Sequence, residues 1–239
     1  GKIGIQPWDG FAAPGELGAW DLDPAVSRAL GEAERALSSE GTGVEKVDLP
    51  GLETSIACYY VIANAEASSN LARFDGVRYG ARADGSSLEE LYTSTRTNGF
   101  GEEVKRRILL GTYVLSSGYY EAYYGKALEV REMLRRSYTD LFSRVDLLIL
   151  PTSPGPAFRL GERLDDPVSM YLSDIFTTPA NIVGLPAISI PAGLSSEGLP
   201  VGIQLIAAAG REDVLLRGAR AIERFFRFRE RCVPGGGEA

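Results

Sequence analysis

Two side chains of opposite charge are the first candidates for chemistry in this sequence. Arg107 follows Arg106 in the segment "EEVKRRILL", and Asp174 stands just before a Thr-Thr-Pro turn. A guanidinium presents a fork of donors that matches the two oxygens of a carboxylate, whereas an aspartate can pair with an ammonium group. One arginine and Asp174 could therefore bind the two charged ends of a free α-amino acid, but neither residue alone establishes this.

These residues also have ordinary structural explanations. An arginine on a surface helix is usually a solvated charge, and an isolated aspartate before a turn usually caps a helix or lies in an exposed loop. Three serine pairs could suggest a nucleophile, but no base lies nearby in the sequence, so we interpret them as helix-packing or turn residues; they are Ser68-Ser69, Ser116-Ser117 and Ser195-Ser196.

A group of tyrosines forms a second candidate surface. Tyr119, Tyr120, Tyr123 and Tyr124 could make a base-stacking platform for single-stranded nucleic acid. The net charge of −7 argues against a protein whose affinity comes from phosphate contacts. The acidic balance and the helical spacing of the tyrosines favour packing in a core instead.

The composition limits the remaining chemistry. The chain contains no histidine, so its residues cannot build a Ser-His-Asp or Cys-His mechanism or a His-rich zinc site. Acid–base chemistry would need Asp, Glu, Lys, Tyr, Cys or a partner. No apolar run approaches the roughly 20 residues of a membrane span. Cys58 and Cys232 form no CxxC pair, and two scattered thiols predict a reducing, cytoplasmic environment.

The elements that must position these residues alternate between strand and helix patterns. We expect strands at 1–8, 43–50, 146–151, 187–193 and 201–207, the last two joined as a hairpin. We expect helices at 23–39, with Asp23 as N-cap, at 53–74, at 212–228, and over most of 102–145 with a break near 116–118.

Further patterns refine these expectations. Within 102–145, one helix face should carry Tyr120, Tyr124, Ala127, Val130, Leu134 and Leu141. Small residues in 53–74 would let another element approach closely, and the polar segment 78–101 reads as a surface excursion. The pattern predicts an α/β fold with mixed strands and helices on the faces, and no linker divides it into independent domains.

Four blocks carry a resemblance to a known family. They are "EASSNLARFDGVRYG", "GFGEEVKRRILLGTYVLSSGYYEAYY", "DLLILPTSPGPAF" and "DDPVSMYLSDIFTTPANIVGLPAISIPAG". The later blocks resemble the amidase signature family as a whole. The earlier blocks resemble its transamidase branch, the A subunits of bacterial glutamyl-tRNA(Gln) amidotransferases, and the order of the blocks matches the carboxy-terminal half of those proteins.

The resemblance implies a fold and a reaction. The fold is α/β, with a mixed central sheet covered by helices, and residues 1–239 would be the carboxy-terminal portion of a single amidase-signature domain. In this family a Ser–cis-Ser–Lys triad hydrolyses the side-chain amide of glutamine. The ammonia then passes to a partner, which amidates Glu-tRNA(Gln) with ATP and magnesium, and subunits B and C complete the complex.

The same resemblance assigns substrate contacts but no catalytic residue. The triad belongs to the first half of the family's proteins, so we expect no catalytic residue and no metal site here, and an inactive chain when alone. Arg107 matches the position that binds the glutamine α-carboxylate, Asp174 the position that binds its α-ammonium, and Tyr59 a tyrosine lining the same pocket. Arg106 and Tyr60 are the adjacent alternatives.

Under this resemblance Asp174 would bind the α-ammonium of glutamine, and the prolines after it would fix the backbone that carries it. Two other hypotheses stay open. The chain could be part of another amidase-signature hydrolase that acts on a small amide. It could also be a non-catalytic interaction module, since it lacks the triad.

Overall fold

The computed structural model describes residues 2–5, 22–39, 43–47, 49, 51–78, 80–162 and 167–227. The chain packs into two compact units. The sheet unit comprises Gly1–Ile56 and Met133–Ala239, and the helical unit is Ala57–Glu132. The boundaries fall inside two helices, α2 (Leu52–Leu71) and α5 (Lys126–Phe142). That the chain belongs to a single amidase-signature domain stays a prediction.

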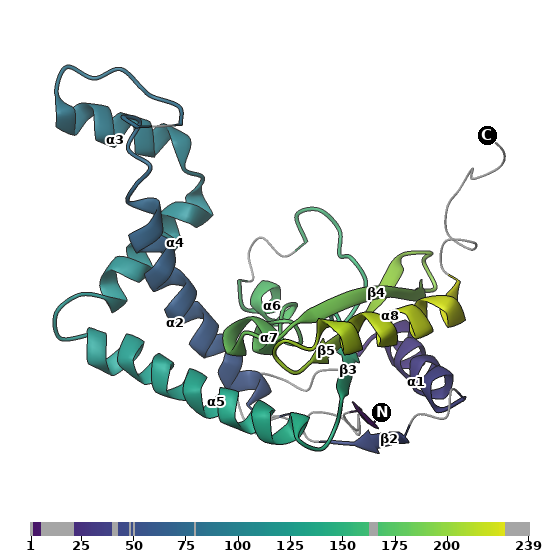
Figure 1. Cartoon of the computed structure of the whole chain (residues 1–239). Helices are drawn as coiled ribbons and strands as arrows, with labels where there is room; N and C mark the ends of the chain where they lie inside the picture. The colour runs from purple at the N-terminus through teal and green to yellow at the C-terminus, as the bar shows by residue number, and fades with distance from the viewer. Residues whose placement is uncertain are drawn as a thin grey trace. The chain divides into compact units, whose positions relative to one another are not determined.

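A mixed sheet forms the centre of the sheet unit, as predicted (Figure 1). Its strand order is β2-β1-β3-β5-β4. Strand β1 pairs in parallel with β2 and β3, whereas β5 runs antiparallel to β3 and β4. The strands are β1 (Lys2–Ile5), β2 (Gly43–Lys46), β3 (Leu147–Pro151), β4 (Ala187–Leu194) and β5 (Pro200–Ala207). The first expected strand continued to residue 8, and residues 6–8 lie outside the described ranges.

The burial of β3 and the hairpin of β4 and β5 follow from the residues of these strands. Every residue of β3, "LLILP", is buried, which is typical of a strand covered on both faces. The predicted hairpin of β4 and β5 is confirmed, and Gly198 in its loop has a φ of +78°, a conformation that favours glycine. Pro191 lies in β4, an edge strand, where a missing N–H costs no ladder bond.

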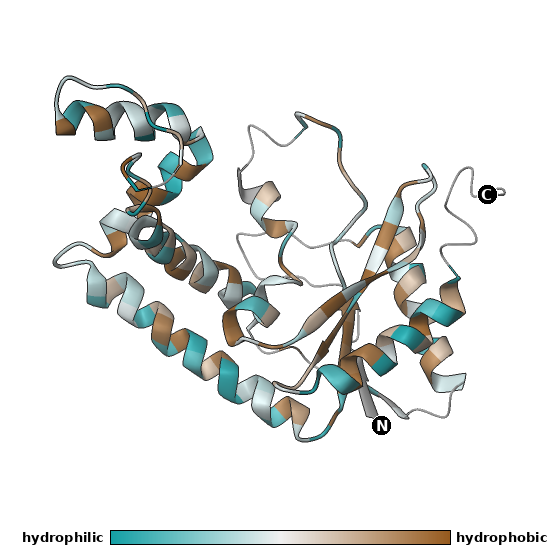
Figure 2. Cartoon of the chain, turned by 45° about the horizontal axis from the view of Figure 1, so that its top comes forward, coloured by the Kyte–Doolittle hydropathy of each residue, from teal (hydrophilic) through white to brown (hydrophobic). Residues whose placement is uncertain are grey.

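Two amphipathic helices, α1 (Pro24–Ser39) and α8 (Glu212–Phe226), cover one face of the sheet. In Figure 2, α8 shows hydrophilic and hydrophobic patches along its length. The predicted N-cap of α1 is confirmed, because Asp23 Oδ1 accepts a hydrogen bond from Ala25 N at 2.7 Å. The apolar stripes of these helices pack against alternate residues of the strands, including Leu147, Ile149, Ile203 and Leu205.

Two short helices were not predicted from the sequence. They are α6 (Pro167–Leu172) and α7 (Thr178–Val183), which flank the turn at 173–177. Six residues are too few for a periodic pattern to reveal a helix. The left-handed Gly184 ends α7 with a φ of +74°.

The helical unit contains α3 (Leu88–Gly99), α4 (Glu102–Val114), a π-helical turn η1 (Glu121–Gly125) and the adjoining parts of α2 and α5. The predicted break near 116–118 is confirmed, since these residues separate α4 from η1. The expected apolar face is only partly right. Ala127, Leu134 and Leu141 are buried, but Tyr120 is exposed.

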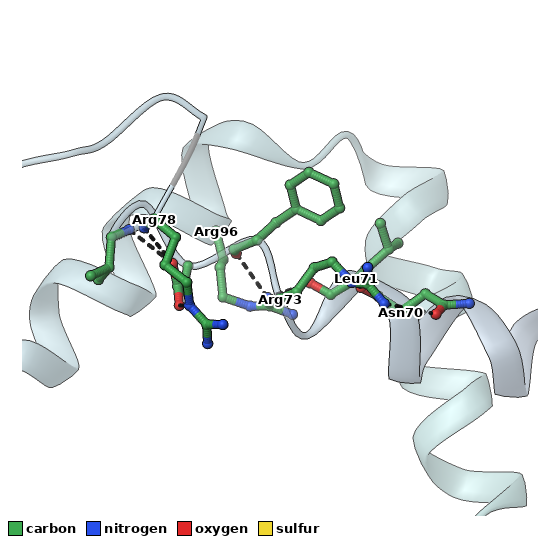
Figure 3. A network of polar contacts seen from close by, with 8 residues as sticks. Asn70, Leu71, Arg73, Arg78 and Arg96 are labelled. Atoms are coloured by element: carbon green, nitrogen blue, oxygen red, sulfur yellow. Dashed lines mark hydrogen bonds and ion pairs between the residues drawn. The ribbon is translucent and has the colours of Figure 1, made fainter.

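Arg96 holds the exposed segment that follows α2 in place. The guanidinium of Arg96 donates hydrogen bonds to the backbone oxygens of Leu71 at 3.0 Å and Phe74 at 3.1 Å (Figure 3). It also lies 5.0 Å from the centre of the Phe100 ring. These contacts hold the end of α2 and the turn that follows it, where the Leu71 carbonyl also accepts a hydrogen bond from the Phe74 amide at 3.1 Å. The exposure predicted for 78–101 is confirmed for most of the described residues in that segment.

Helices α2 and α4 approach each other closely at Gly111. A Cβ atom placed there would overlap the backbone carbonyl of Asn64 and crowd the side chain of Ser68. The prediction that small residues in 53–74 admit a close neighbour is therefore confirmed. Among the described helices, none is long and apolar enough to cross a membrane.

We predict that Gly111→Ala destabilises the chain by about 1–3 kcal/mol, because the new methyl group must push against backbone. Gly31→Ala is the matched control, since no atom lies within 4 Å of a Cβ at this position of α1. That substitution should stabilise the chain by about 0.4–1 kcal/mol. Urea unfolding followed by circular dichroism measures both, and equal effects of the two substitutions would show that the approach of α2 and α4 is not tight.

Candidate functional site

Arg107 and Tyr59 come together in the helical unit, although 48 residues separate them in the sequence. Arg107 lies on α4 and Tyr59 on α2, and Arg107 Nη1 donates a hydrogen bond to Tyr59 Oη at 3.4 Å. Arg107 Nε donates a second bond to Glu103 Oε1, one helical turn earlier, at 2.9 Å. The side chain of Arg107 is 32% exposed, so it is partly shielded yet still open to a ligand.

The surroundings keep Arg107 cationic. Its hydrogen bond to Tyr59 has the largest effect and raises the pKa of Arg107 above its ordinary value, while partial burial acts in the opposite direction. The bond to Glu103 and the charge of that carboxylate raise the pKa further. A permanent positive charge on a planar fork is suited to a carboxylate ligand.

Glu103 connects the two neighbouring arginines. One of its oxygens accepts from Arg107 Nε, and the other accepts from Arg106 Nη1 at 2.8 Å. Arg106 is the more exposed of the two, at 54% of its side chain. The contact with Tyr59 distinguishes Arg107 from Arg106, and the same contact distinguishes Tyr59 from Tyr60, whose ring packs edge-on against that of Tyr59.

Asp174 lies in the sheet unit, in the turn between α6 and α7. Its backbone carbonyl accepts hydrogen bonds from the amides of Thr177 and Thr178 and from the hydroxyl of Thr178 at 2.8 Å. Thr177, not Asp174, is the N-cap residue of α7, and Pro179 occupies the first turn of that helix. The backbone of Asp174 is therefore fixed by local bonds while the residue itself is exposed.

The three predicted site residues thus divide between the two units. The structure brings Arg107 and Tyr59 together within the helical unit, and it places Asp174 in the sheet unit. Sequence reasoning missed Glu103, although its spacing of four residues from Arg107 is that of a helical ion pair. It also missed Gln204, a polar residue in an apolar strand, which bonds to the backbone two residues after Asp174.

One serine of each pair has the structural role that we expected. Ser68 Oγ donates to Ala65 O, and Ser116 Oγ donates to Tyr113 O. Ser195 Oγ accepts from the amide of Leu199 in the hairpin loop. Each of these hydroxyls bonds to nearby backbone, which is how serine commonly acts in helices and turns.

The prediction that the four tyrosines pack in a core is wrong for three of them, whereas Tyr124 is half-buried. Tyr119, Tyr120 and Tyr123 are 41%, 41% and 44% exposed. Tyr113, Tyr119 and Tyr123 cluster with one another, and the ring centres of Tyr113 and Tyr119 are 4.4 Å apart. Helical spacing places residues on one face but does not say whether another element covers that face.

Other reactive groups are sparse in the part of the chain that the structure describes. There, no group of three or more His, Cys, Asp or Glu side chains is arranged to hold a metal ion. Cys58 is a buried free cysteine whose Sγ lies 3.2 Å from the carbonyl oxygen of Ala127. Burial raises the pKa of Cys58, which makes its thiolate, and hence its nucleophilicity, less available.

Comparison with known proteins shows strong similarity over most of the chain. The A subunits of glutamyl-tRNA(Gln) amidotransferase from Exiguobacterium sp., Parvibaculum lavamentivorans and Myxococcus xanthus are 51%, 53% and 51% identical to it. The alignments cover 89%, 85% and 94% of this chain. They cover 44%, 40% and 46% of the relatives, so the chain spans less than half the length of each.

Solved structures agree with this similarity. The crystal structure of the glutamyl-tRNA(Gln) amidotransferase A subunit from Thermotoga maritima is 40% identical, with a TM-score of 0.66 over 93% of this chain and 42% of that one. Allophanate hydrolase from Kluyveromyces lactis shares the fold, with a TM-score of 0.67 at 21% identity, over 100% of this chain and 36% of that one. The family model named Amidase matches residues 11–216. This chain belongs to the amidase family.

Proposed function

We propose that this chain is the glutamine-binding part of the glutaminase component of a glutamyl-tRNA(Gln) amidotransferase. The observation that carries the proposal is the Arg107–Tyr59 contact. The chain that contains it shares about half of its aligned residues with A subunits of glutamyl-tRNA(Gln) amidotransferases. The identity to these proteins is far above the 20–26% shared with several other amidases of known structure, which favours the transamidase over a hydrolase of another small amide.

Free glutamine carries two charges that a binding site can use. In the proposed site, Arg107 binds the α-carboxylate, Tyr59 fixes the orientation of Arg107, and Asp174 binds the α-ammonium. A site that provides both partners penalises an amide lacking either charge, because the unmatched polar group of the site would stay unpaired. Free glutamine would thus be distinguished from glutamine within a peptide.

Glu103 can give up its bond to Arg107 when a substrate carboxylate binds to that arginine. Its carboxylate bonds to both Arg106 and Arg107, one through each oxygen. When the substrate carboxylate takes its place on Arg107, Glu103 keeps its bond to Arg106. The exchange therefore leaves no carboxylate without a cation, which limits the electrostatic cost of binding.

The chemical step requires residues beyond these 239. Hydrolysis of the amide converts glutamine and water to glutamate and ammonia, and we assign it to a Ser–Ser–Lys triad on the remainder of the amidase domain, with lysine as the base. Ammonia then goes to a partner that amidates Glu-tRNA(Gln), and subunits B and C are the proposed partners. We assign ATP and magnesium to that partner, and we expect the complex to be located in the cytoplasm.

The first test of this assignment is glutaminase activity. The chain is assayed alone and after mixing with the complementary part of the Myxococcus xanthus relative, 46% of which it matches. We expect no activity alone and release of ammonia from glutamine after mixing. Activity of the chain alone would mean that it contains a nucleophile, and would contradict the division of roles proposed here.

The charge pair is tested in the same reconstituted enzyme, together with the partner proteins. Asp174→Asn and Arg107→Lys should each raise the KM for glutamine roughly tenfold or more, because each removes one charged contact or its fork geometry. Amidation driven by free ammonium should be unaffected. Arg217→Lys, at an exposed arginine of α8, is the control, with little expected change, and equal losses with glutamine and ammonium would contradict the binding role.

A further inference from the structure

Gln204 is an unusual residue for its position. It lies in β5 within the apolar sequence "VGIQLIA" and is 4% exposed. Its neighbours Ile203 and Leu205 belong to the core beneath α1 and α8, so alternation along the strand places Gln204 on the opposite face of the sheet. Burying an amide is costly unless it forms hydrogen bonds, so this position calls for a specific partner.

That partner is the turn that carries Asp174. Gln204 Nε2 donates a buried hydrogen bond of 2.8 Å to the backbone oxygen of Phe176, which is 28 residues away in sequence. Within the sheet, Gln204 is paired with Leu150 of β3 on one side and Ser189 of β4 on the other. The donor therefore stands on a strand that both neighbours hold in place.

Within the turn, other contacts act differently from this bond. Thr177 and Thr178 bond to the carbonyl of Asp174, which closes the turn on itself. Ile175 and Phe176 are buried, but apolar packing has no directional preference. A hydrogen bond requires alignment of donor and acceptor, so the Gln204–Phe176 bond gives the turn a directional contact with the sheet.

We infer that Gln204 is a positioning residue for recognition of the substrate α-ammonium. By holding the carbonyl of Phe176, it keeps the exposed Asp174 at one place relative to the sheet. A carboxylate held in advance at the binding position avoids the ordering cost that a mobile one would bear. The inference rests on the proposed function, which gives Asp174 its ligand.

The test uses Gln204→Met in the reconstituted amidotransferase, since methionine has a similar size and lacks the donor. The KM for glutamine should rise about tenfold, with a much smaller change in kcat, because binding geometry rather than the chemical step is altered. Ammonium-driven amidation should stay unchanged. Ile203→Val is the matched control, because it weakens the core on the other face of the same strand without touching the turn.

A double substitution separates positioning from general loss of stability. In the Asp174→Asn background, Gln204→Met should add little to the KM, because the carboxylate that it positions is already gone. Glutaramate, which lacks the α-amino group, should bind with equal affinity to the enzyme without substitutions and to the Gln204→Met variant. Independent, multiplying effects of the two substitutions would overturn the inference.

Hydrogen exchange of the turn gives a readout that does not depend on activity. The amides of Thr177 and Thr178, which donate to the carbonyl of Asp174, should exchange faster in Gln204→Met and not in Ile203→Val. Unchanged exchange with an unchanged glutamine KM would overturn the role of Gln204. If instead Asp174→Asn leaves the glutamine KM unchanged, the proposed function fails, whereas faster exchange still establishes Gln204 as the anchor of the turn.

Discussion

The sheet unit depends on one constraint, which is that β3 and residues 203–207 of β5 are buried on both faces. Their backbone groups must bond within the sheet, and their side chains need cover above and below. Helices α1 and α8 supply that cover on one face with apolar side chains. On the other face β5 carries an amide, Gln204, and the turn before α7 is bonded to it. The central strands thus determine both the core and the place of Asp174.

Most of the regular structure could be predicted from the sequence, because the strands and the longer helices carry clear periodic patterns. The failures have physical causes. Helices α6 and α7 are too short to show a period, and they are held by tertiary packing and by the turn between them. The tyrosines of the segment after α4 have helical spacing, yet exposure depends on neighbours that spacing does not encode.

The candidate site was predictable only in part. Charge singled out Asp174 and the Arg106–Arg107 pair, but the choice of Arg107 over Arg106, and of Tyr59, came from the family resemblance. The structure adds what resemblance did not provide. It pairs Arg107 with Tyr59, joins both arginines through Glu103, and fixes the backbone of Asp174 through Thr178 and Phe176. The Arg107–Tyr59 and Gln204–Phe176 bonds join distant parts of the chain, which is why a local pattern could not reveal them, whereas the helical spacing of Glu103 and Arg107 could have.

The contact at Gly111 has a consequence for how α4 can vary. Only a residue without a side chain fits against the Asn64 carbonyl, so α4 has a single register against α2. A shift of one residue along the chain would place Thr112 or Leu110 there and turn the helix by about 100°. It would carry Arg107 away from Tyr59 at the same time. An insertion or deletion between residues 107 and 111 should therefore be far less tolerable than a substitution on the exposed side of the same helix.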